Sequence, residues 1–238
     1  MTTRSVEQMV ERRVKEWLLR CAPVVPDPTA DARPVARRSW ITLSRAAGSG
    51  GEQIAEDLAQ RLGYEIVDRQ ILEVLTTQEH IADHVASALD EKTHSSLRLW
   101  VGEIIRGRLF DRRDYVVALV RVLNAMAAVG GIIVLGRGAN HLLESRDGLH
   151  VRVVAPLPHR VRLLATQEGI TQDEAERILR RIDKDRAQFV GTIFHAEIED
   201  PESYDLMVNT GGLVIRQASV IIEKALREKV GSRSDLVV

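Results

Sequence analysis

Five short apolar runs, separated by stretches long enough for helices, are the feature of this sequence that most constrains its fold. The runs cover residues 40–43, 64–67, 132–135, 150–154 and 206–208. Parallel strands need a crossover of a dozen or more residues, which an α-helix normally supplies. Helical patterns fill the intervals, at residues 53–61, 69–128, 158–167, 172–189 and 216–228. We therefore expect an α/β fold in which helices cover both faces of a parallel sheet.

The first 39 residues differ in character and are predicted to lie outside this sheet. Apolar residues within 5–20 recur at spacings of three and four, which indicates an amphipathic helix. Residues 22–36 contain four of the seven prolines and are typical of an extended strap. We interpret residues 1–39 as this helix and strap, 40–228 as the folded domain and 229–238 as a tail. The apolar stripe of the helix needs a partner, which could be the domain itself, a second copy in a homodimer or a membrane surface.

Composition excludes several classes of protein. The chain has 238 residues and a formal net charge of −1, so it is not a polycation that coats nucleic acid. Its 3 Trp, 3 Tyr and 3 Phe provide little surface for stacking bases, and no apolar run approaches the ~20 residues of a membrane span. The single cysteine, Cys21, favours a reducing compartment. We predict a cytoplasmic protein with neither nucleic acid nor a membrane as its partner.

A glycine-rich segment after the first apolar run indicates a phosphate site. The run leads into G-S-G-G at residues 48–51 and then into a helix. Backbone N–H groups at such a turn converge at the positive end of the helix dipole, which suits a phosphate. The P-loop pattern G-x-x-x-x-G-K-[ST] matches only in part. Arg45, Gly51 and Glu52 stand where the pattern has its first glycine, its lysine and its hydroxyl residue. A glycine turn without a ligand therefore stays an alternative.

Cationic residues follow other predicted strands. Arg137, within G-R-G, comes directly after the run at 132–135, and Arg160 opens the helix after the run at 150–154. Lys184 and Arg186 follow in a charged helical segment. Since the carboxyl ends of parallel strands meet at one edge, where α/β proteins bind ligands, we expect these cations to gather there.

Six motifs, in this order, resemble those of the cytidylate kinase-like family, a divergent branch of the P-loop nucleoside monophosphate kinases. They are S-R-x-x-G-S-G-G, Y-x-x-x-D-R-x-I-L, I-x-x-G-R-G-A-N, A-P-L-x-x-R, D-K-x-R and Y-D-L-x-x-N-T-G. The resemblance covers about residues 40–228. It implies a three-layer P-loop NTPase-type core with a five-stranded parallel sheet, a helical acceptor-binding insertion at 69–128 and a lid at 169–200.

The resemblance also implies roles for individual residues. The residues implied to bind ATP are Gly48, Ser49, Gly50, Gly51, Glu52, Gln53, Asn209 and Thr210. Those implied to bind the acceptor are Asp68, Arg69, Arg137 and Arg160. Lys184 and Arg186 resemble lid cations that close on the phosphates. Since arginine suits phosphate contact, Arg45, Arg137, Arg160 and Arg186 could supply the charge of the missing lysine. We predict that the cations assisting catalysis are Arg45, Arg137, Lys184 and Arg186. Gly138 departs from the family's G-R-D motif, where an acidic residue stands, and Glu52 adds negative charge beside the phosphates.

These implications define a leading hypothesis and two others. The first is an ATP- and Mg²⁺-dependent phosphotransferase acting on small nucleotides, with CMP as the first candidate acceptor and no residue assigned as a metal ligand. The missing lysine and Glu52 motivate the second, a catalytically silent nucleotide-binding sensor that uses the N-terminal helix for oligomerisation. The third is a structural dimer module, favoured only if the glycine loop is occluded.

Overall fold

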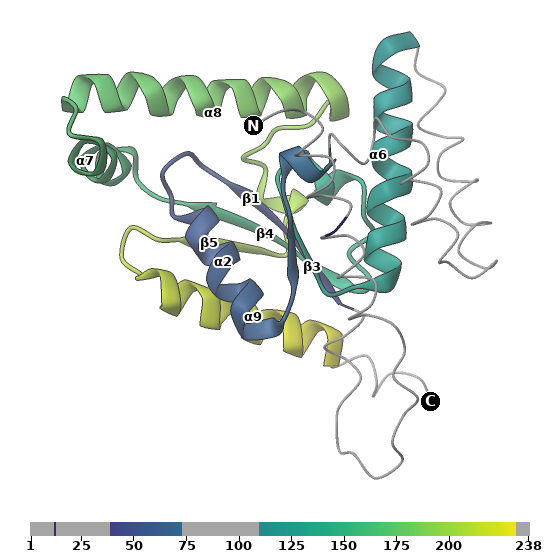
Figure 1. Ribbon diagram of the computed structural model, residues 1–238. Helices are drawn as coiled ribbons and strands as arrows, with labels where there is room; N and C mark the ends of the chain where they lie inside the picture. The colour runs from purple at the N-terminus through teal and green to yellow at the C-terminus, as the bar shows by residue number, and fades with distance from the viewer. Residues whose placement is uncertain (1–11, 13–38, 73–109, 232–238) are drawn as a thin grey trace.

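The computed structural model describes residues 39–72 and 110–231, together with Arg12 (Figure 1). The predicted N-terminal helix and strap, most of the predicted insertion and all but the start of the predicted tail lie outside the described residues. The parts that remain contain every predicted strand and the glycine-rich segment.

A five-stranded parallel sheet forms the centre of the fold, as the sequence predicts. Its strands are β1 (Trp40–Arg45), β2 (Glu65–Val67), β3 (Ile132–Leu135), β4 (Gly148–Val154) and β5 (Leu206–Asn209), in the spatial order β2-β3-β1-β4-β5. All neighbouring strands run parallel, and Trp40 lies opposite Ile132 on one side and Gly148 on the other. Because β1 is central, the loop that follows it begins in the middle of the carboxyl edge of the sheet.

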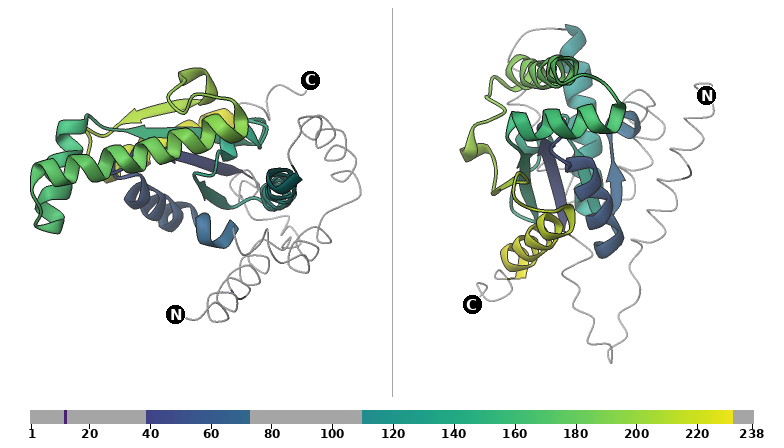
Figure 2. Two further views of the ribbon diagram at one scale, coloured as in Figure 1. Left: turned by 90° about the horizontal axis from the view of Figure 1, so that it is seen from above. Right: turned by 90° about the vertical axis from the view of Figure 1, so that its left-hand side faces the viewer.

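Helices lie on both sides of this sheet and complete the predicted three-layer architecture of a P-loop NTPase-type core (Figures 1 and 2). The helices are α2 (Gly51–Leu62), α6 (Phe110–Val129), α7 (Leu157–Glu168), α8 (Gln172–Phe194) and α9 (Ile215–Gly231). Two short 3-10 turns occupy Ala139–His141 and Pro201–Ser203. In Figure 1, α8 runs along the top of the molecule, with the sheet between it and α9. Residues 69–72 begin a further helix after β2.

Alternation along the strands distributes their apolar residues between two clusters of the core. Ile41 and Leu43 of β1 belong to a cluster with α2 and α9, whereas Trp40 belongs to a cluster with α6. In α2, the buried residues Ile54 and Leu58 are four positions apart and so lie on one face of the helix. Each fully buried Ile or Leu side chain contributes roughly 1.5–3 kcal/mol through removal of apolar surface from water. These two clusters therefore hold the layers together.

A buried polar strip interrupts the Trp40 side of the sheet between β1 and β4. Thr42 pairs in register with His150, and Ser44 with Arg152. The Thr42 Oγ1 and His150 Nδ1 atoms are 2.7 Å apart, and Arg152 Nη1 donates to Ser44 Oγ at 2.9 Å. The His150 ring also packs against Trp40, with 5.3 Å between the ring centroids. The strip leads from the core towards the carboxyl edge of the sheet.

We expect the free energy of unfolding to fall as the pH is lowered from 6.5 towards 4. Burial lowers the pKa of His150 to about 4, although the nearby Asp205 opposes this effect. An unfolded histidine has a pKa of about 6.5, so between these values the unfolded chain binds a proton that the folded chain does not. The loss of stability that His150 causes reaches up to about 3 kcal/mol at the acidic end of this range.

Urea denaturation at several pH values between 4.5 and 7 tests this expectation. His150→Gln should flatten the dependence, leaving a smaller slope because burial also lowers the pKa of His141. His159→Gln, on α7, removes a histidine outside the polar strip and serves as the control. An unchanged slope in a folded His150→Gln variant would contradict the assignment.

Candidate active site

The segment between β1 and α2, residues 46–50, forms the predicted glycine loop. Gly48 and Gly50 have φ of 72° and 80°, in the left-handed region that favours glycine. A Cβ added to Gly50 would also lie 2.5 Å from the Cδ1 atom of Ile215. The loop leads directly into α2, so it lies at the positive end of that helix dipole. This arrangement of strand, glycine loop and helix N-terminus is suited to a phosphate group.

Hydroxyl groups attach the loop to the sheet. The buried Ser49 Oγ donates to the carbonyl oxygen of Ala46 at 2.8 Å, within the loop. Thr210, which directly follows β5, donates from Oγ1 to the Ser49 carbonyl oxygen at 2.8 Å. Both hydroxyl groups thus donate to backbone carbonyl oxygens of the loop and help to fix its conformation. The direct ATP contacts predicted for Ser49 and Thr210 stay predictions.

An ion pair attaches the loop to α7 and α8. Arg160 of α7 donates from Nη1 to the Ala47 carbonyl oxygen at 2.8 Å and to Asp183 Oδ2 at 2.6 Å. The backbone N–H of Ala47 donates to Asp183 Oδ1 at 2.7 Å. Arg160 is only 8% exposed, and its Nε donates to the Ala155 carbonyl oxygen. Arg160 thus supports the loop, and this position gives no support to its predicted acceptor contact.

Arg45 fills the space that a side chain at position 51 would need. A Cβ added to Gly51 would lie 2.6 Å from the Arg45 Cβ and 3.3 Å from the Leu43 Cδ2. At the other end of the same side chain, a Cβ added to Gly136 would lie 2.8 Å from Arg45 Nη1. The arginine therefore lies between two glycines. The missing P-loop lysine has a physical reason, because a lysine at position 51 cannot coexist with Arg45 in this place.

Glu52 is bound by arginines on two sides. Arg45 Nε donates to Glu52 Oε1 at 2.9 Å, and Arg186 Nη2 lies 3.6 Å from the same oxygen. Burial alone would raise the pKa of Glu52, but the charge and hydrogen bond of Arg45, aided by Arg186, lower it below its usual value. The carboxylate is therefore ionised and compensated. Arg186 also donates from Nη1 to the Arg45 carbonyl oxygen at 2.9 Å.

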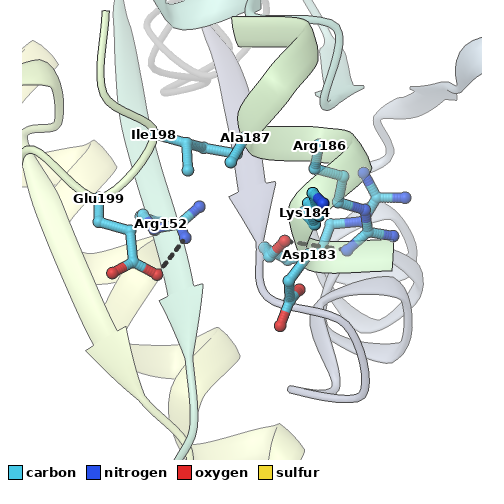
Figure 3. Close-up of a pocket in the computed structure, with 8 residues that line it drawn as sticks. Arg152, Asp183, Lys184, Arg186, Ala187, Ile198 and Glu199 are labelled. Carbon is cyan, nitrogen blue, oxygen red and sulfur yellow. Dashed lines mark hydrogen bonds and ion pairs between the residues drawn. The ribbon is translucent and has the colours of Figure 1, made fainter. Parts of the chain in front are cut away.

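A pocket of about 220 Å³ lies beside the loop, between the sheet and α8 (Figure 3). Its lining residues are Arg45, Arg152, Asp183, Lys184, Arg186, Ala187, Ile198 and Glu199. Burial lowers the pKa of Arg186, and the like charges of Arg45 and Arg152 lower it further, against the opposing effect of Glu52 and Asp183. Such crowding of positive charge favours an anionic ligand. The pocket brings together Arg45, Lys184 and Arg186, three of the four cations predicted to assist catalysis.

The remaining predicted acceptor residues lie near the ends of β2 and β3 and do not line this pocket. Asp68 Oδ1 accepts the backbone N–H of Ile71 at 3.0 Å and so caps the helix that begins at Arg69. The Arg137 guanidinium lies over the Phe189 ring of α8, 5.2 Å from its centroid. In the strand order, β2 is an edge strand that is separated from β1 by β3. Asp68 and Arg69, which follow β2, therefore lie towards one lateral edge of the sheet, whereas β4 lies on the other side of β1.

Gly138 is explained by the ring of Phe194. Its φ is 63°, and a Cβ at this position would overlap that ring. An acidic side chain, as in the G-R-D motif, therefore has no room here.

None of the eight residues predicted to bind ATP is among the residues that line the pocket. Gln53 is exposed on the first turn of α2, and Asn209 Oδ1 accepts the backbone N–H of Gly211 at 2.9 Å.

Sequence reasoning missed Arg152, Asp183 and Glu199 as site residues. A signal for Arg152 was present, because a charged side chain stands in the apolar run H-V-R-V-V of a central strand. Asp183 opens the D-K-x-R motif, but no role was predicted for it there. Glu199 carries no comparable signal, since acidic residues are common in the surrounding loop.

The described carboxylates do not fit a resident metal ion. No group of three or more His, Cys, Asp or Glu residues that could hold a metal occurs within 39–72 and 110–231. Glu52 and Asp183, which contact Arg45 and the loop respectively, are both engaged by arginines. Mg²⁺ in kinase sites is held by one or two carboxylates together with substrate phosphates, so these paired side chains offer it little on their own.

Of the helices within the described ranges, none is both long and apolar enough to cross a membrane.

Comparisons with known proteins point to one family and to a similar fold. The model of the cytidylate kinase-like family matches residues 40–212. The cytidylate kinase of Thermococcus kodakarensis is 27% identical over 177 residues, which are 71% of this chain and 78% of that protein. The crystal structure of an uncharacterized protein from Eubacterium ventriosum is similar in fold, with a TM-score of 0.59 and 16% identity, over 79% of this chain and 97% of that one.

We expect Gly51→Ala to lower the free energy of unfolding by about 1–3 kcal/mol, the usual cost of overpacking a filled site. The added Cβ must displace the Arg45 side chain from between the two glycines. Gly51→Lys, which restores the P-loop pattern in the sequence, should be at least as destabilised. Urea denaturation measures both effects.

Gly231→Ala is the matched control, because a Cβ there meets nothing within 4 Å. Alanine forms helix better than glycine by about 1 kcal/mol, so a Gly51→Ala variant that gains as much stability as Gly231→Ala would show that Arg45 does not fill this space.

Proposed function

The chain belongs to the cytidylate kinase-like family, and on that premise we propose that it transfers a phosphoryl group from ATP to a small phosphate-bearing acceptor, with CMP as the first acceptor to test. Family membership supports a kinase-type enzyme with nucleotide substrates. The observation that carries the finer proposal is the glycine loop with Arg45 beside it. A phosphate cradle without a nearby cation would be poorly suited to phosphoryl transfer, and Arg45 supplies that cation.

The donor phosphates are proposed to bind at residues 48–51, against the N-terminus of α2. Phosphoryl transfer depends mainly on positioning and on stabilising negative charge. Arg45, Lys184 and Arg186 line the adjoining pocket and are proposed to supply that charge. Arginine binds phosphate oxygens through two parallel hydrogen bonds, so Arg45 could hold its ligand in a defined orientation as well as neutralise it.

The acceptor is proposed to approach from the side of β2 and β3. Asp68, Arg69 and Arg137 lie near the ends of these strands, and the interval that follows residue 72 lies outside the described residues. Gly138 stands in place of the acidic residue of the G-R-D motif, so the acceptor assay includes purine as well as pyrimidine monophosphates.

A metal ion would shield the phosphates of ATP if it enters with the nucleotide. Since the described carboxylates do not fit a resident ion, no step in this proposal is assigned to Mg²⁺. The chain's own contribution consists of the loop N–H groups and the arginine side chains around them.

One observation favours the second function, a catalytically silent nucleotide sensor. Asp183 accepts the N–H of Ala47, and Glu52 engages Arg45 and Arg186. Two carboxylates thus occupy groups that phosphates would use. A domain that binds ATP without turnover would fit this arrangement, with the N-terminal helix as its proposed oligomerisation element. The cytoplasmic location likewise stays a prediction.

Purified full-length protein with ATP and Mg²⁺ should release ADP above the rate without acceptor when an accepted monophosphate is added. We would test CMP, UMP, dCMP, AMP and GMP with a coupled ADP assay. Arg45→Met should lower kcat by two orders of magnitude or more, because interactions with the transferring group typically contribute ~10²–10³-fold.

Arg177→Met, which removes an exposed arginine on α8, serves as the control for loss of charge. Calorimetric titration with ATP separates the two functions. Binding without turnover on any acceptor would favour the sensor, and the absence of ATP binding would exclude both.

A further inference from the structure

Arg152 is a buried arginine that neither the proposed donor site nor the proposed acceptor site uses. It lies in β4, next to the central strand, and is 2% exposed. Its guanidinium reaches the pocket beside the glycine loop (Figure 3). Burying a charged group costs free energy unless the group is paired and hydrogen-bonded. The partners of the Arg152 guanidinium therefore indicate whether its role is structural or ligand binding.

The compensation of Arg152 within the described residues is incomplete. Nη1 donates to Ser44 Oγ, but Nε has no hydrogen-bond partner in the described part of the chain. The carboxylate paired with it, Glu199 Oε1, is 3.5 Å from Nη2, and the Glu199 side chain is 83% exposed. An exposed carboxylate at this distance contributes little, because water screens the pair and the side chain loses entropy in forming it. The Arg152 guanidinium therefore retains hydrogen-bond donors for an anion that binds closer than Glu199 does.

The guanidinium is oriented by neighbours that do not neutralise it. Its Cζ lies 5.8 Å from the centroid of the Tyr204 ring, and the Tyr204 hydroxyl donates to the Ile198 carbonyl oxygen at 2.8 Å. The same hydroxyl lies 3.3 Å from Ser44 Oγ, the acceptor of the Arg152 bond. A fixed orientation with spare donors is the usual property of an arginine that binds a ligand, since the ordering cost is met before binding.

The geometry points to Arg152 as a ligand-binding residue: with Arg45 and Arg186 it forms a site for a phosphoryl group, and Glu199 is the counter-ion that this group displaces. The volume of about 220 Å³ is below the ~300–1,000 Å³ of clefts that hold whole small molecules. The pocket thus fits the charged end of a ligand. This inference rests on the proposed function for the source of the phosphoryl group, but not for the binding of the anion itself.

Two sources share this chemistry. The group is either the phosphate of the monophosphate acceptor or the terminal phosphates of ATP. Because both present tetrahedral oxyanions, the pocket does not distinguish them, and the experiment must.

Calorimetric titration of the full-length protein tests the site, with inorganic pyrophosphate, CMP and ATP as separate probes. Arg152→Met should weaken pyrophosphate binding at least tenfold, because each charge-assisted hydrogen bond lost is worth that much or more. A loss confined to CMP among the nucleotides assigns the site to the acceptor, and a loss confined to ATP assigns it to the donor. Arg162→Met, which removes an exposed arginine on α7, should change none of the three affinities.

Glu199→Gln keeps the test decisive if Arg152→Met does not fold, as circular dichroism would reveal. Glu199 is exposed, so its replacement should leave folding intact and tighten pyrophosphate binding severalfold by removing the competing carboxylate. Pyrophosphate affinity that is unchanged in folded Arg152→Met, or unchanged in Glu199→Gln when Arg152→Met does not fold, overturns the inference. Both measurements are independent of turnover, so a protein that phosphorylates nothing can still confirm the anion site, and an active kinase can still fail it.

Discussion

The ion pair between Arg160 and Asp183 is the interaction on which the rest of the site depends. It joins α7 to α8, and both side chains also bind Ala47, one through the carbonyl oxygen and the other through the N–H. The glycine loop is therefore held at the same point by two helices that lie outside the α2 and α9 layer. Truncating either side chain would leave the charge of the other partly buried and unpaired. The free energy lost in this way is far larger than the net stabilisation that the pair provides. Because α8 forms one wall of the pocket, the ion pair also determines where the pocket lies.

Glycines in this site are explained by the large side chains beside them. Gly51 and Gly136 accommodate Arg45, and Gly138 accommodates the ring of Phe194. Each departure from a familiar motif, the lost lysine and the lost acidic residue, coincides with a neighbour that has taken the space. A motif comparison that scores positions one at a time cannot detect this exchange. In this chain a positive charge stands at the strand end, close to the loop, whereas the P-loop pattern has one at the start of the helix.

The fold could be predicted from the sequence largely because its signals are local. The β-branched runs and glycine turns identify all five strands within two residues at either end, and the predicted helices at 158–167 and 216–228 agree with α7 and α9. The site could be predicted only in part. Arg45, Lys184 and Arg186 stand in recognisable motifs. Asp183 stands in one as well, but its bond to the loop, like the place of Glu199, depends on the packing of α8 and the following loop against the sheet. Arg160 is the converse case: its position at a helix start suggested a ligand contact, and in the structure its side chain binds the loop and Asp183, so the acceptor contact stays a prediction.

The bond between Asp183 and the N–H of Ala47 makes the loop and α8 thermodynamically dependent on each other. A ligand that takes this N–H must first release the carboxylate, so part of its binding free energy is spent on α8. By linkage, any factor that holds α8 in its present position weakens such a ligand by the same amount that the ligand weakens the attachment of α8. Ligand binding at the loop and the position of α8 are then coupled. The free energy of the bond between Asp183 and Ala47 determines how strong this coupling is.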